Sequence, residues 1–111
     1  MRNDRERLVD MLESIHNIER YAIRGRLAFD IDELFQVWVV RHLQIIGEAA
    51  SRVSETTQMR FPLIPWGKMI GMRHILVHGY FDIDLRIVWS VVEDDLPSLK
   101  HLIESALLSP D

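Results

Sequence analysis

The side chains with the clearest capacity for chemistry are Arg73 and His78, five positions apart in the segment 73–80. On an ideal helix this spacing is about 140°, so both can border one groove if His78 ends the helix just before Gly79. Arginine supplies a permanent charge and a planar donor fork that fits a phosphate. Histidine exchanges protons near neutral pH.

Together these two groups could cleave RNA without a metal. The base removes the 2′-OH proton, the adjacent phosphate is attacked, and the guanidinium stabilises the charge that develops. Tyr80 would add an exposed phenol nearby. The same spacing also fits a surface arginine and a helix-terminal histidine stabilised by the helix dipole, and the residues alone leave both interpretations open.

The local charge supports a binding role. Residues 56–81 contain no Asp or Glu but include Arg60, Lys68 and Arg73, together with His74. This segment carries a formal charge of +3 in a chain whose net charge is -4, so the remaining residues carry -7. A positive segment in an acidic protein can dock a phosphate or an acidic partner. The alternative is an apolar, proline-interrupted segment that simply has few charges.

Composition limits the classes of protein to consider. The chain has 111 residues, the size of one domain. Its 13 Lys and Arg against 17 Asp and Glu exclude nucleic-acid binding through the whole surface, so any such site must be local. The absence of cysteine excludes a disulfide framework, a thiolate zinc site and a cysteine nucleophile.

No targeting, membrane or metal signal is apparent. No segment reaches the roughly 18 apolar residues of a membrane span, and residues 1–7 are too charged for a signal peptide. We therefore expect a cytoplasmic protein with no membrane association. Because His16, His42 and His101 fall on separate predicted helices, we expect no metal site and no other cofactor.

The apolar residues recur with a helical period along most of the chain, and no segment alternates long enough to be a strand. Residues 4–21 form the first predicted helix, with 25–30 as its end and a connector. The others run from Asp30 or Asp32 to about Val53, from Pro65 to Val77 or His78, and onward from Asp82 or Asp84, with a kink or break at Pro97. The prediction is an all-α, up-and-down bundle of about four main helices.

The apolar stripes assigned to these helices specify which faces should be buried. On the first helix the stripe is Leu8, Met11, Leu12, Ile15, Ile18 and Ala22. On the second it is Leu34, Val37, Trp38, the stem of Arg41, Ile45, Ile46, Ala49 and Val53. On the last it is Leu85, Val88, Trp89, Val92, Leu96, Leu99, Leu102, Ile103 and Leu107.

The second predicted helix is apolar on more than one side, so it is either central or shared with a partner. Trp38, Trp66 and Trp89 could supply a dimer interface, although core packing is the alternative for each. Gly47 would allow a close helix approach, which we interpret as packing. Glu48 is interpreted as a paired helix carboxylate rather than a catalyst.

Several blocks of the sequence resemble the HepT-like family, part of the HEPN superfamily of small all-helical proteins. The resemblance covers essentially the whole chain after the first helix. The blocks are Ile46-Gly47-Glu48-Ala49-Ala50, Ile64-Pro65-Trp66, Ile70-Gly71-Met72-Arg73, Leu76-Val77-His78-Gly79-Tyr80-Phe81, Asp84-Leu85, Val88-Trp89 and Asp95-Leu96-Pro97.

This resemblance implies a ribonuclease toxin of a type VII toxin–antitoxin pair. The family motif is Arg, four residues, His, one residue, Tyr, which Arg73, His78 and Tyr80 match. The resemblance implies that Arg73 and His78 are catalytic and that Tyr80 receives adenylate from an MntA-type nucleotidyltransferase antitoxin. His74 stands where the family often has Asn.

We expect His74, Tyr80, Lys68 and Arg60 to support catalysis or bind RNA. A homodimer would bring two copies of the sparse site together across one cleft. The alternative is a non-catalytic, nucleotide-binding or partner subunit of a minimal nucleotidyltransferase.

Overall fold

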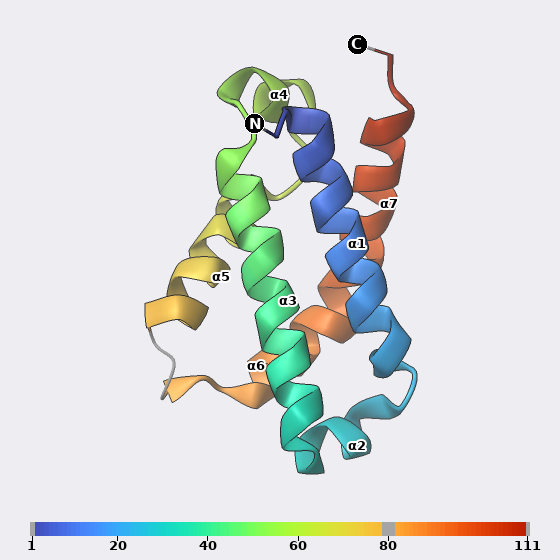
Figure 1. Cartoon of the computed structure of the whole chain (residues 1–111), viewed down its shortest axis with the longest axis vertical. Coiled ribbons are helices and arrows are strands. Elements are labelled where there is room, and N and C mark those ends of the chain that lie inside the picture. The colour runs from blue at the N-terminus through green and yellow to red at the C-terminus, as the bar shows by residue number, and fades with distance from the viewer. Residues whose placement is uncertain (1, 79–81, 111) are drawn as a thin grey trace.

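A computed structural model describes residues 2–78 and 82–110, with only the backbone of His78. All of the regular structure in these ranges is helical (Figure 1). The elements are α1 (Asp4–Ala22), α2 (Gly25–Ile31), α3 (Glu33–Arg52), α4 (Glu55–Arg60), α5 (Trp66–His78), α6 (Leu85–Ser90), the π-helical segment η2 (Val91–Asp95) and α7 (Leu96–Leu108). None of the helices in these ranges combines the length and apolar character needed to cross a bilayer.

The long helices α1, α3, α5 and α7 alternate in direction, which confirms the predicted all-α, up-and-down bundle. Helices α1 and α3 pack along one another at the centre, while α5 lies against α3 and α7 lies against α1 (Figure 1). Local signals place the helix starts. The Asn3 side chain accepts from the Glu6 N–H while Glu6 reaches back to the Asn3 N–H, and the Asp32 carboxylate accepts from Phe35 N–H at the start of α3.

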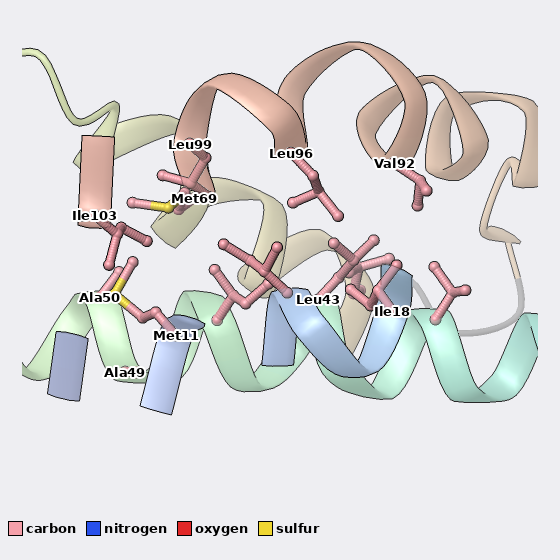
Figure 2. Close-up of a cluster of buried hydrophobic side chains, with 14 of the residues drawn as sticks. Met11, Ile18, Leu43, Ala49, Ala50, Met69, Val92, Leu96, Leu99 and Ile103 are labelled. Carbon is pink, nitrogen blue, oxygen red and sulfur yellow. The ribbon is translucent and has the colours of Figure 1, made fainter. Parts of the chain in front are cut away.

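The core lies between α1, α3 and the segment from η2 to α7. Figure 2 shows Met11 and Ile18 of α1, Leu43 of α3 and Leu99 of α7 converging on it. The predicted stripes of the first and last helices are confirmed, because most of their members are buried and the rest are partly buried against the core. Trp66 and Trp89 are also buried, so core packing is their role within this chain.

The predicted face of α3 is partly wrong. Ile46, Ala49 and Val53 are buried as expected, but Leu34 is 81% and Val37 53% exposed. The central helix turns a neighbouring face inward instead, made of Phe35, Val39, Val40, His42, Leu43, Ile46, Gly47, Ala49 and Ala50. Helix α3 therefore has two apolar faces, and within the described part of the chain only one of them is covered.

The predicted connector at 25–30 is also wrong, since these residues belong to α2. Gly25 has a φ of 84°, in the left-handed region that glycine adopts without strain, and it begins a new helix at a changed angle. Phe29 anchors α2 by burying its ring against Phe35 and Trp89, with ring centroids 5.4 and 5.1 Å away.

Pro97 falls at the start of α7, immediately after η2, so the helix changes geometry where a kink was expected. The Leu96 N–H donates to the Val91 carbonyl, one residue further back than in an α-helix. Because Pro97 occupies the first turn of α7, its missing N–H costs little. Both Val92 and Leu96 still reach the core.

His42 is a buried polar residue between α1 and α3. Its Nδ1 lies 3.1 Å from Ser14 Oγ, and its ring packs edge-on to Trp38 with centroids 4.5 Å apart. Burial lowers the pKa of His42 below its usual value near 6.5, and the neighbouring charge of Arg41 lowers the pKa further. The folded protein therefore holds this imidazole neutral.

This burial predicts a loss of stability in mild acid. The unfolded chain binds a proton on His42 as the pH falls through about 6.5, whereas the folded chain does so only at a lower pH, so the free energy of unfolding falls across that interval. We expect His42→Gln to flatten the dependence of Tm on pH between about pH 7.5 and pH 5. His16→Gln, which removes an exposed histidine from α1, should leave the wild-type slope in place. An unchanged slope in His42→Gln would contradict the assignment.

Candidate functional site

Arg73 lies on the stripe that α5 turns towards α3. The buried residues Trp66, Met69 and Leu76 share this stripe and hold α5 in place. The indole of Trp66 also donates to the Phe61 carbonyl at 3.0 Å, which fixes the start of the helix. The stem of Arg73 thus begins within the contact between α3 and α5, and packing between the two helices constrains it.

Gly47 makes this approach possible. A Cβ at position 47 would lie 2.2 Å from Arg73 Cβ and 2.7 Å from the Met69 carbonyl oxygen. Any side chain there would force α3 and α5 apart. The interpretation of Gly47 as a packing residue is therefore confirmed, and its particular partner is the stem of Arg73.

The guanidinium of Arg73 reaches a cleft of about 290 Å³ formed by α1, α3 and α5. Its charged and amide lining comprises Arg7, Asp10, Arg41, Gln44, Glu48 and Arg73. Arg73 Nη2 forms an ion pair with Glu48 Oε2 at 2.9 Å, and both side chains remain about one third exposed. The motif arginine is thus open to a ligand while one carboxylate orients it.

Glu48, which lines this cleft, forms ion pairs with two arginines. Its other oxygen, Oε1, accepts from Arg52 Nε at 2.9 Å, one helical turn along α3. The hydrogen bond from Arg52 lowers the pKa of Glu48, and the nearby charges of Arg73 and Arg7 lower the pKa further. Glu48 is therefore anionic at neutral pH and is a paired carboxylate, as interpreted from the sequence.

The other cations of the positive segment have different neighbours. Lys68 Nζ forms an ion pair with Asp95 Oδ2 of η2 at 3.1 Å. Arg60 donates to the Pro110 carbonyl and lies over the Phe61 ring, 4.9 Å from its centroid. Neither residue lines the Arg73 cleft. Their predicted part in RNA binding stays a prediction, as does that of His74, which is exposed on α5 beside Arg73.

The remaining motif positions fall at the edge of the described chain. His78 closes α5, as predicted to within one residue, but its side chain lies outside the described part. The predicted helix stop at Gly79 and the phenol of Tyr80 also lie outside it. Across residues 2–78 and 82–110, no group of three or more His, Asp or Glu side chains is arranged to hold a metal ion.

Sequence reasoning missed Arg7 and Arg41 as members of this site. They come from α1 and α3, far from the motif along the chain, and they meet Arg73 only because the three helices pack together. A partial signal was available, because Arg41 interrupts an otherwise apolar stripe of α3.

Comparison with known proteins identifies the family of the chain. A family model described as ribonuclease HepT-like matches residues 11–106. A Thermococcus cleftensis protein that is named as a HepT ribonuclease is 37% identical over 106 residues, 93% of this chain and 94% of its own length. A Methanocaldococcus jannaschii protein, assigned RNase activity by name only, is 35% identical over 104 residues, 87% of this chain and 90% of its own.

No solved structure gives a significant match. The match to the family model spans most of the chain. The two relatives match this chain over nearly their full lengths, and their names agree with the ribonuclease family that the model describes. The chain belongs to the HepT-like family of ribonucleases.

Proposed function

We propose that this protein is a metal-independent endoribonuclease and the toxin of a type VII toxin–antitoxin pair, acting on RNA in the cytoplasm. The observation that carries the proposal is the placement of the motif arginine. Arg73 is held by packing against Gly47, oriented by Glu48, and still exposed to a cleft large enough for part of a nucleotide.

The proposed reaction is transesterification of the RNA backbone. His78 takes the proton from a 2′-OH, the 2′ oxygen forms a bond to the adjacent phosphorus, and the bond to the 5′ oxygen breaks. The leaving 5′ oxygen takes up a proton, and the product end is a 2′,3′-cyclic phosphate. Arg73 stabilises the extra negative charge on the phosphate oxygens as it develops.

The experiment that tests the proposal is cleavage of single-stranded RNA in excess chelator. We expect cleavage to persist in EDTA and to disappear in His78→Ala, with 2′,3′-cyclic phosphate ends on the products. Equal cleavage by His78→Ala at unchanged purity would remove His78 from the mechanism. No cleavage by any preparation would favour the second candidate, a non-catalytic subunit that binds a minimal nucleotidyltransferase.

The outer face of α3 supports a homodimer. Leu34, Val37, Trp38 and Arg41 line a hollow of about 470 Å³, and Val37 and Arg41 also line a second one of about 390 Å³. Arg41 borders the Arg73 cleft as well, so the exposed apolar face and the cleft adjoin. A second copy seated on Leu34, Val37 and Trp38 would bury these side chains, leave Arg41 at the rim of the interface and bring the two clefts together. Sedimentation of Leu34→Lys and wild type at equal concentration tests this, since a monomeric wild type would contradict it.

Regulation by the antitoxin is proposed at Tyr80. Adenylate on this phenol would add a bulky anion two residues from His78 and oppose the entry of RNA. Intact mass measurement after incubation with an MntA-type nucleotidyltransferase and ATP tests the modification. The expected adduct maps to Tyr80 and is absent from Tyr80→Phe, which keeps its cleavage activity. Silencing of Tyr80→Phe through a modification elsewhere would overturn this assignment.

Glu48 should compete with RNA for Arg73. Glu48→Gln removes the one carboxylate that contacts this guanidinium within the described chain, while keeping a side chain of similar size. We expect Kd for a non-cleavable RNA to fall about three- to tenfold at low salt, with a smaller effect at high salt. Glu104→Gln makes the same charge change at an exposed position of α7 and should leave Kd unaltered. Weaker binding by Glu48→Gln would show that orientation of Arg73 outweighs competition.

A further inference from the structure

Two arginines in the Arg73 cleft have no ion-pair partner within the described part of the chain. Arg7 projects from α1 and Arg41 from α3, and both line the same cleft as Arg73. Every other charged side chain that lines the cleft takes part in an ion pair. Unpaired arginines that share a concave site with a third arginine are suited to binding an anion.

The carboxylates of the cleft are already compensated. Asp10 is held by Arg2, which donates from both Nε and Nη2, the Nε contact being 2.7 Å. Glu48 is shared by Arg52 and Arg73. Neither carboxylate forms an ion pair with Arg7 or Arg41, although the charge of Arg7 still acts on Glu48. A local excess of positive charge remains, although the whole chain carries -4.

We propose that Arg7 and Arg41 bind two further backbone phosphates of the RNA, beside the phosphate held by Arg73. This inference rests on the proposed RNA cleavage. Because the two arginines come from different helices, they can hold a strand at separate points. A single-stranded RNA offers a phosphate at every nucleotide, and an arginine fork matches the paired oxygens of each.

The first test measures binding separately from chemistry. A fluorescent 2′-O-methyl RNA of about twelve nucleotides cannot be cleaved but retains its phosphates. We expect Arg7→Gln and Arg41→Gln each to raise Kd by about three- to tenfold at low salt. Each should also reduce the slope of log Kd against log salt by about 0.7, the value for one single-stranded phosphate contact. Arg20→Gln removes an exposed α1 arginine without an ion pair in the described chain, and it should bind like wild type.

The second test separates these arginines from the catalytic pair. On cleavable RNA, Arg7→Gln and Arg41→Gln should raise KM and leave kcat within about twofold, since they hold substrate and transition state alike. Thermal unfolding of each variant provides the folding control. If wild type cleaves but both variants match Arg20→Gln in Kd and KM, the phosphate-binding assignment is wrong.

Two further outcomes separate the proposed phosphate contacts from the proposed RNA cleavage on which they rest. Loss of RNA binding in both variants, with no cleavage by wild type, would support the phosphate contacts and overturn the proposed catalysis. Normal RNA binding together with weakened binding of the antitoxin would show that the arginines recognise an acidic protein surface. That result would overturn the inference while leaving catalysis in place.

Discussion

Arg73→Ala is expected to reduce kcat for RNA cleavage by at least about 100-fold, the loss found when one donor to a developing oxyanion is removed. The variant also removes the guanidinium from its contact with Glu48, so the cleft loses a positive charge and retains the carboxylate. We expect KM to rise as well, because a phosphate approaching Glu48 would meet uncompensated negative charge. Single-turnover kinetics on a defined RNA measure both effects.

Arg73→Lys is the informative companion to this variant. It keeps the positive charge but loses the planar fork, so it should recover binding more fully than kcat. Arg20→Ala provides the control for loss of an exposed arginine. Wild-type kcat in Arg73→Ala, at unchanged Tm and purity, would remove Arg73 from the mechanism and with it the proposed role of the cleft.

Gly47→Ala should have a large structural effect for the addition of a single methyl group. The new Cβ would lie 2.2 Å from Arg73 Cβ and 2.7 Å from the Met69 carbonyl oxygen, so these atoms must separate by about 1.5 Å to restore normal contact. Overpacking of this kind costs about 1–3 kcal/mol, partly offset by the higher helix propensity of alanine. We expect Tm to fall by about 4–15 °C.

Gly47→Ala should also impair cleavage beyond its effect on stability, because the displaced atoms belong to Arg73. A shift of about 1 Å at a catalytic group can cost about 100-fold in rate. Gly71→Ala is the matched control, since a Cβ there meets no atom within 4 Å and should raise Tm slightly. Calorimetry and kinetics on the two variants provide the comparison. Wild-type Tm and kcat in Gly47→Ala would show that the two helices accommodate the methyl group freely.

The faces of α1 and α7 could be predicted from the sequence because each has one apolar stripe with polar residues opposite. Leu8 and Met11 on α1, and Leu99 and Ile103 on α7, therefore identify the core directly. Helix α3 differs, because both the Leu34 side and the neighbouring side are apolar. Periodicity identifies apolar faces but does not specify which of two faces the same chain covers.

The sequence predicts the part of the candidate site that lies in one short segment, but it does not predict the residues that helix packing brings to that segment. Arg73 stands within a contiguous motif, whereas Arg7 and Arg41 join it from two other helices. Counting charges along the chain identified Arg60 and Lys68 instead. These side chains contact the Pro110 carbonyl and Asp95, because Arg60 lies on a different helix, α4, and Lys68 lies on another face of α5 than Arg73.

The π-helical turn of η2 affects how the sequences of this family should be aligned. The turn holds one residue more than an α-helical turn would, so removing any one of Val91–Asp95 would let the helix run on as regular α-helix. Because the wide turn absorbs the extra residue, that deletion would leave the facing of the helix after it nearly unchanged, and Leu96, Leu99 and Ile103 would stay in the interior. A homologue with a regular α-helical turn at this point should therefore align with a gap of one residue and keep the same hydrophobic register downstream.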